Sequence, residues 1–295
     1  MIAEMAELGF SHVELSHGVR ISLIPGVLKA LEEGTVRVSS VHNFCPLPAG
    51  VTQAAPNLFE PSSVDARERS QWMRHTKRTI DFAAQIGTGV AVCHLGSVIF
   101  FWLNPVWALR RYRRRNPEVA VDSDKEYAAL VVKCLGKLRK RMGPYWAHTL
   151  ECVKQVCTYA RDKGVSLAFE NREKFEELPL DADMPEFLSG LPADAPLGLW
   201  HDTGHARLKE MMGLMEPKAY LERNAARILG FHLHDVSTDG LDHQPVGSGK
   251  VDFGLVSSFW RPEHRLTLEL GPRISADDVR SSRRRIENLI AARFP

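Results

Sequence analysis

The sequence predicts a (β/α)₈ barrel, because short β-type runs alternate with helical segments along almost all of its 295 residues. Several runs are apolar up to a polar end, as in Val90–Val92 and Leu167–Phe169, which suits strands covered on both faces. Histidine, aspartate or glutamate ends one run after another, at the position where parallel barrels carry their functional side chains. Together these observations favour parallel strands surrounded by helices.

The runs can be placed individually. The predicted strands are His12–Ser16, Val36–His42, Gly89–His94, Ser166–Glu170, Leu197–Asp202, Leu229–His234 and Arg265–Glu269. Helical periodicity is clearest in Ala66–Gln85, Trp146–Asp162, Arg207–Ile228 and Ala276–Ala292. A closed barrel of this kind has eight strands, and the chain opens directly in a predicted helix, Ile2–Leu8. The first strand is therefore expected to be missing, which leaves two strand edges unpaired.

One stretch departs from the alternation, and we predict a single domain over residues 1–295 with an insertion at about 98–141. It follows the strand ending at His94 and includes a predicted helix, Lys125–Arg141, so it is expected at the mouth of the barrel. Its aromatic residues predict a subunit contact combined with the edge of a lid, and hence a homo-oligomer, a dimer. They are Phe100, Phe101, Trp102 and Trp107.

Composition restricts the class of protein. Hydrophobic residues make up 44% and charged residues 25%, as in ordinary globular proteins, and the net charge of +2 does not indicate a dedicated nucleic-acid binder. The five cysteines fit neither a zinc motif nor a disulfide framework, and the first residues do not resemble a signal peptide, so a cytoplasmic location is expected. No membrane partner is expected either, because Asn104 and Pro105 break the longest apolar run.

The polar strand ends are the candidate functional residues. A lone histidine there is usually a hydrogen-bonded surface residue, but a glutamate after three apolar residues needs a partner or a metal ion. The conjunction over successive strands favours a metal site, and the mixed ligands suit Mn²⁺, Zn²⁺, Co²⁺ or Mg²⁺. His201 is expected to point to the opposite face from Asp202, where it either supports a metal ligand or has a structural role. The candidates are His42, His94, Glu170, Asp202, His205, His232, His234, His243 and Glu269.

These strand ends carry a resemblance to a known family. The motifs GFSHVELSH, SVHNF, VCHLGS, AFEN, HDTGHA, GFHLHD, HQPVGSGKVDF and LTLEL resemble the xylose-isomerase-like TIM barrel superfamily, which contains sugar-phosphate isomerases and epimerases and metal-dependent apurinic-site endonucleases. The resemblance implies a divalent metal ion on Glu170, Asp202, His232 and Glu269, and leaves a second or third ion open. It also implies that Glu170 and Glu269 exchange protons with a sugar, polyol or sugar phosphate through a metal-stabilised enediolate.

Alternatives to this isomerase or epimerase remain open. In the endonuclease branch, His42, His94, His205 and His243 match ligands of additional zinc ions, but Leu241 stands where an aspartate is expected. A zinc-dependent phosphodiesterase and a non-catalytic metal-binding barrel are therefore the alternatives. A small carbohydrate is the expected substrate, and a nucleic-acid partner is not expected. Arg172 is predicted either to contact the substrate or to form a plain salt bridge.

Overall fold

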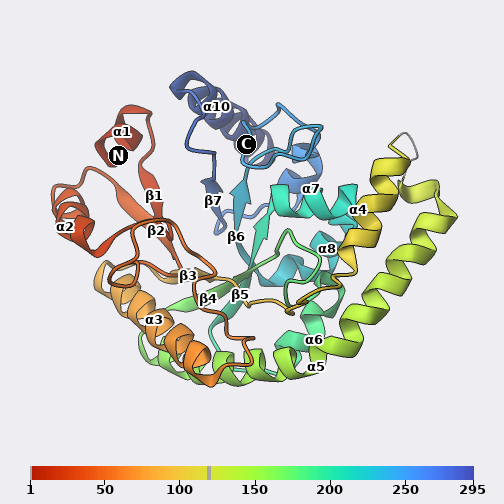
Figure 1. Cartoon of the computed structure of the whole chain (residues 1–295). Coiled ribbons are helices and arrows are strands. Elements are labelled where there is room, and N and C mark those ends of the chain that lie inside the picture. Colours follow the sequence, from red (N-terminus) through yellow and green to blue (C-terminus); the bar gives the residue numbers. More distant parts are fainter. Residues whose placement is uncertain (1, 118–120) are drawn as a thin grey trace.

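A computed structural model describes residues 2–117 and 121–295, so residues 118–120 of the predicted insertion lie outside the described part. Seven parallel strands form one sheet in the order β1 to β7, curved into a barrel with helices outside (Figure 1). This confirms the predicted fold class. The strands are β1 His12–Leu15, β2 Arg37–His42, β3 Val90–Cys93, β4 Ser166–Glu170, β5 Leu197–Asp202, β6 Ile228–Leu233 and β7 Arg265–Leu268.

Helices follow most strands and cover the outside of the sheet. The α-helices are α1 Ile2–Glu7, α2 Ile24–Glu32, α3 Ala66–Gln85, α4 Val106–Arg115, α5 Lys125–Asp162, α6 Met184–Ser189, α7 Thr203–Met211, α8 Pro217–Asn224, α9 Phe253–Ser258 and α10 Ala276–Arg293. Short 3₁₀ turns lie at Ile21–Leu23, Val121–Ser123, Asp181–Asp183 and Ala225–Arg227. None of the helices described here is long and apolar enough to cross a membrane.

The barrel is open on one side, between β1 and β7. Neither strand pairs on that side with any residue of 2–117 or 121–295 (Figure 1). All four residues of β7 are partly exposed, whereas the four residues of β3 are buried. The structure thus has the seven strands that the sequence predicts, with the opening where an eighth strand would close the barrel.

Three predicted helices differ from those observed. The helices expected at Lys125–Arg141 and Trp146–Asp162 are one continuous helix, α5, with Pro144 inside it. The single helix expected at Arg207–Ile228 is wrong: α7 ends at Met211, and α8 begins at Pro217. Between them Gly213 has a φ of 63°, a left-handed conformation that favours glycine, and Pro217 suits the first turn of a new helix.

The largest side chain of the cluster Val90, Val92, Ala168 and Trp200 lies opposite a glycine. Trp200 on β5 is fully buried and pairs in register with Gly230 on β6. A Cβ atom at Gly230 would lie 2.4 Å from the indole ring, so only glycine leaves room for it. This packing fills the interior of the barrel directly below the polar ends of β4 to β7.

Candidate metal centre

Four side chains from four successive strands converge at the carboxyl ends of β4 to β7. They are Glu170, Asp202, His232 and Glu269, and each offers a ligand atom within 4.8 Å of the others. His232 Nδ1 lies 2.7 Å from Glu170 Oε1, 2.9 Å from Glu269 Oε2 and 3.8 Å from Asp202 Oδ2. The parallel arrangement explains the convergence, because all the strands present their carboxyl ends on one rim. We call these four residues the central cluster.

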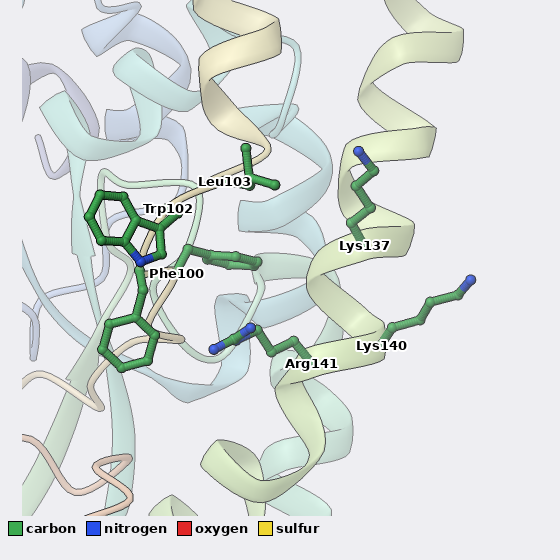
Figure 2. Close-up of a pocket in the computed structure, with 7 residues that line it drawn as sticks. Phe100, Trp102, Leu103, Lys137, Lys140 and Arg141 are labelled. Carbon is green, nitrogen blue, oxygen red and sulfur yellow. The ribbon is translucent and has the colours of Figure 1, made fainter.

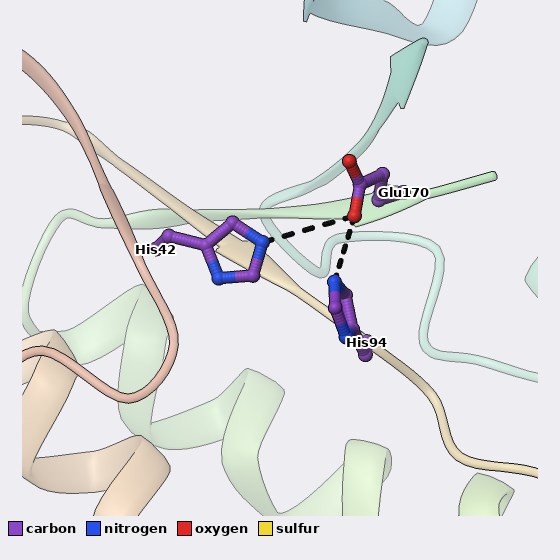
Figure 3. A group of neighbouring side chains, drawn as sticks. All are labelled: His42, His94 and Glu170. Carbon is purple, nitrogen blue, oxygen red and sulfur yellow. Dashed lines mark hydrogen bonds and ion pairs between the residues drawn. The ribbon is translucent and has the colours of Figure 1, made fainter. Parts of the chain in front are cut away.

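Glu170 also belongs to a second group. Its Oε2 atom lies 2.7 Å from His94 Nε2 and 3.7 Å from His42 Nε2 (Figure 3). These histidines end β2 and follow β3, so both reach Glu170 from the neighbouring side of the barrel. The Nδ1 atom of His94 lies 2.7 Å from Asn57 Oδ1, which fixes the orientation of the ring. One oxygen of Glu170 thus faces the central cluster and the other faces this histidine pair.

Glu14 on β1 is a site residue that the sequence reasoning missed. Its Oε1 atom lies 2.9 Å from His232 Nε2, and its Oε2 atom accepts a hydrogen bond of 2.6 Å from the Ser40 hydroxyl. A carboxylate on one imidazole nitrogen directs the other nitrogen, here Nδ1, toward the cluster. The signal was present, because Glu14 lies between the apolar residues Val13 and Leu15 of a predicted strand.

His205 and Arg172 lie beside Glu170. The Asp202 side chain accepts a hydrogen bond of 2.6 Å from the His205 N–H, which caps α7 and brings the ring to the rim. Arg172 Nη1 donates to Glu170 Oε2 at 2.7 Å, and Arg172 Nε donates to Glu177 Oε1 at 3.3 Å. Of the two predicted roles for Arg172, the salt bridge is therefore present in the structure.

His243 lies on a loop that a single buried carboxylate organises. Asp235 accepts hydrogen bonds from the backbone N–H groups of Val236, Gly247, Gly249 and Val251. His243 Nε2 then lies 3.7 Å from Glu269 Oε1. The sequence Pro-Val-Gly-Ser-Gly-Lys is thus a loop wrapped around Asp235.

Two other histidines have different surroundings. His234 shares the inner face with His232: its Nε2 lies 3.0 Å from Asp202 Oδ2, and its ring stacks on His243 at 4.3 Å. Its Nδ1 accepts a hydrogen bond from the His243 N–H, so both ring nitrogens have partners within the protein. His201 is buried on the opposite face, against Tyr220 and Phe231, as predicted.

The charges of the cluster stabilise one another. Burial by itself raises the pKa of Glu170, but Arg172 and hydrogen bonds from His232, His42 and His94 hold it well below its usual range. The pKa of Asp202 is likewise lowered to about 2, because His205 and His234 outweigh the effect of burial. Burial lowers the pKa of His232, yet Glu269 and Glu14 raise it well above 6.5. Ionised carboxylates thus draw positive charge into a buried site.

This donor set fits a divalent cation. Three carboxylates and one imidazole meet in the central cluster, and hard or borderline divalent ions bind such mixed oxygen and nitrogen donors. Three further groups also have ligand atoms within 4.8 Å: His42, His94 and Glu170; His234, His243 and Glu269; and Glu173, His205 and Asp242. The last of these groups includes Asp242, which directly follows Leu241. Leu241 itself is 53% exposed and has no ligand atom to offer.

Comparison with known families decides where this barrel belongs. The family described as "Xylose isomerase-like TIM barrel" matches residues 2–259. The chain is a member of the xylose isomerase-like TIM barrel family. A search among curated protein sequences finds no match for this member of the family. Many solved structures share its fold.

Three solved structures illustrate the likeness. A "D-tagatose 3-epimerase-like protein" has 17% sequence identity and a TM-score of 0.67, covering 98% of this chain and 91% of its own. An "L-ribulose 3-epimerase" has 14% identity and a TM-score of 0.68, covering 99% and 88%. A "Xylose isomerase-like TIM barrel" protein from Mycobacterium smegmatis, in complex with magnesium, has 17% identity and a TM-score of 0.61, covering 100% and 88%. At these identities the likeness establishes the shared fold.

Proposed function

We propose that this protein is a metal-dependent isomerase or epimerase acting on a sugar, a polyol or a sugar phosphate. The observation that carries the proposal is the convergence of Glu170, Asp202, His232 and Glu269 within 4.8 Å. Two structures of the same fold, described as a D-tagatose 3-epimerase-like protein and an L-ribulose 3-epimerase, support sugar chemistry. The likeness to a protein in complex with magnesium supports a divalent ion.

The central cluster would hold one divalent ion, Mn²⁺, Zn²⁺, Co²⁺ or Mg²⁺. When bound there, such an ion would supply Lewis acidity toward two neighbouring oxygens of the substrate. Glu14 would keep the His232 ring in the orientation that presents Nδ1 to the cluster. Arg172 would compensate the charge of Glu170.

Glu170 and Glu269 would exchange the proton. Both carboxylates have a pKa held well below the usual value, so each is ionised, which is the protonation state that a general base needs before it accepts a proton. For Glu269 burial opposes this, and His232 beside it outweighs the burial. The side chain of Glu269 is 27% exposed and that of Glu170 only 2%, so a substrate reaches Glu269 from the open mouth.

A proton-exchange assay on the Glu269→Gln variant tests this mechanism. Ketoses and their phosphates are incubated with the protein in D₂O, and deuterium entering at carbon is followed by NMR. We expect Glu269→Gln to lose exchange by on the order of 10²–10⁴-fold with an unchanged circular dichroism spectrum. The matched control is Glu263→Gln, on an exposed side chain in a salt bridge with Arg261 before β7. Exchange retained within tenfold of the parent would disprove the role of Glu269.

A second candidate is a zinc-dependent phosphodiesterase of the apurinic-site endonuclease type. It is favoured by the additional groups of ligand atoms, above all His42 and His94 beside Glu170, and Asp242 beside His205. Elemental mass spectrometry on protein purified without chelator separates the two. About one ion per chain supports the isomerase. Two or three zinc ions, together with cleavage of abasic duplex DNA, would favour the phosphodiesterase.

A further inference from the structure

The insertion carries a concentrated patch of exposed apolar side chains. Phe101, Trp102 and Leu103 are consecutive and are 74%, 83% and 83% exposed, and Trp107 on the first turn of α4 is 52% exposed. No other three consecutive large hydrophobic residues among those described are exposed to this degree. Large exposed apolar patches on otherwise ordinary surfaces mark interaction sites. We call residues 99–103 together with Trp107 the apolar tip.

Basic side chains flank the apolar tip on α4. Arg110, Arg111 and Arg114 lie three, four and seven residues after Trp107, so all of them share its helix face. Each of these three side chains is exposed. The face therefore changes along the helix from an indole ring to guanidinium groups.

Basic side chains also flank the tip on α5. A groove of about 570 Å³ separates the loop 100–103 from Lys137, Lys140 and Arg141 (Figure 2). The Arg141 guanidinium lies 5.4 Å from the centre of the Phe100 ring, which anchors the base of the loop to the helix. Lys137 and Lys140 project from α5 on the opposite side of the groove from Trp102 (Figure 2). The tip thus lies between two rows of positive charge.

The charge of the chain is divided unevenly. Residues 98–141 contain eleven Lys and Arg against four Asp and Glu, whereas the remainder contains 27 against 32. The insertion is therefore strongly positive and the rest of the molecule is negative, although the net charge of the whole chain is only +2. A molecule with this asymmetry is oriented by a negatively charged surface, with the insertion toward it.

We propose that the apolar tip and its basic flanks bind the surface of an anionic phospholipid bilayer. Aromatic and leucine side chains enter the boundary between headgroups and acyl chains, while arginine and lysine attract the anionic headgroups. This is peripheral binding, which needs no helix that spans a membrane. It departs from the expectation, drawn from the sequence, that the protein has no membrane partner. Binding would leave the rim of the barrel close to the surface, because the insertion follows β3 at that rim.

Other occupants fit the tip less well. A second copy meeting it through the same patch would bring two strongly positive insertions together, which costs free energy. A nucleic acid would satisfy the arginines, but the apolar tip offers only two polar side-chain atoms, the indole nitrogens of Trp102 and Trp107, for contacts to base edges. An acyl-chain boundary satisfies both the apolar tip and its charged flanks.

Vesicle sedimentation with the full chain tests the proposal. We expect vesicles of phosphatidylcholine with phosphatidylserine to bind the protein at least about tenfold more tightly than pure phosphatidylcholine vesicles, and binding to weaken with added salt. Acyl chains carrying bromine should quench the tryptophan fluorescence, because Trp102 would lie among them. The absence of binding to the anionic vesicles would overturn the proposal.

Two variants and two controls identify the surface that binds. The first variant changes Phe101, Trp102 and Leu103 together to Ser, which removes the apolar contact. The second combines Lys137→Glu with Lys140→Glu, which reverses the charge. Each of these two variants should bind vesicles at least about tenfold more weakly than the parent. The controls make the same kinds of change elsewhere. They are Val64→Ser, at a 58% exposed residue, and Lys154→Glu with Arg284→Glu, on exposed faces of α5 and α10.

The pattern of results decides between the occupants. Vesicle binding that the controls keep and both variants lose supports the proposal. Binding that persists in the triple Ser variant would overturn it. Two other results would also overturn it, each in the absence of vesicle binding. One is a dimer that the triple Ser variant abolishes, and the other is a salt-sensitive affinity for DNA. All substituted side chains are exposed, and circular dichroism verifies that each variant is folded.

Discussion

His232 illustrates how a single residue is prepared for its position. Its ring is fully buried, packs against Trp200 at 5.3 Å and lies between Glu14 on one nitrogen and Glu170 with Glu269 on the other. The sequence predicted that the His232 side chain lies on the inner face of its strand. Glu14, more than two hundred residues away in the chain, decides which ring nitrogen faces Glu170 and Glu269. Such a contact leaves no local sequence pattern.

His264 provides a pH prediction at the same scale. Burial and the nearby Arg261 lower its pKa from 6.5 to about 4. The neutral ring is therefore kept in the folded state, while the unfolded chain binds a proton below about pH 6.5. The protonation of His264 does not reduce the free energy of unfolding above pH 6.5. As the pH falls from 6.5 toward 4, the free energy of unfolding decreases by at most about 3 kcal/mol on account of this residue.

Replacing His264 tests this linkage. In His264→Gln the side chain stays neutral, so the free energy of unfolding should fall less steeply between pH 6.5 and 4 than in the parent. Urea titrations at a series of pH values measure the difference. His12→Gln, at an exposed histidine of the same barrel, is the control and should leave the slope unchanged. Identical slopes in parent and His264→Gln would contradict the prediction.

At the scale of elements, strands were predicted more accurately than helices. Apolar runs bounded by turn residues located β4 and β5 to the residue, because a buried parallel strand is a short apolar run. Periodicity alone missed the break between α7 and α8, because α8 resumes the amphipathic pattern after Gly213. It also divided α5 at Pro144, which the structure accommodates within the helix.

The loop after β6 leads to a prediction of its own. Four backbone N–H groups donate to the buried carboxylate of Asp235, and an amide in its place has one acceptor oxygen fewer. We expect Asp235→Asn to lower the free energy of unfolding by about 2–3 kcal/mol, since buried N–H groups lose their acceptor. Chemical denaturation measures the change.

A control and a local measurement complete this experiment. Asp239→Asn alters an exposed aspartate on the same connection, and it should change stability by less than about 0.5 kcal/mol. Amide hydrogen exchange over residues 243–251 should accelerate in Asp235→Asn and not in Asp239→Asn. If the two variants are equally stable, Asp235 does not organise the loop.

At the scale of the whole molecule, the open side of the barrel is the main departure from a closed fold. The strands beside the opening have partners on one side only, and β7 is partly exposed along its length. Sheet edges of this kind open locally with less free energy than central strands. A second property of the whole molecule is its charge distribution: the insertion is positive, whereas the remainder of the chain is negative.

Hydrogen exchange tests the consequence of the opening. Peptides covering β7, Arg265–Leu268, should exchange some of their amides at least about tenfold faster than those covering β4, Ser166–Glu170, which is paired on both sides. Mass spectrometry after short labelling times measures both in one experiment, so that β4 is the internal control. Equal protection of β4 and β7 would mean that another segment covers the edge in solution.

The sequence by itself determined the class of fold and the polar strand ends, because burial on both faces and parallel pairing leave a direct pattern in the residues. Tertiary structure decided which ends meet: Glu170 faces two groups at once, Glu14 reaches His232 across the barrel, and Asp235 holds the loop of His243. It also exposed the apolar tip between two basic helix faces. These contacts join residues far apart in the chain, and only the curvature of the folded sheet brings them within bonding distance.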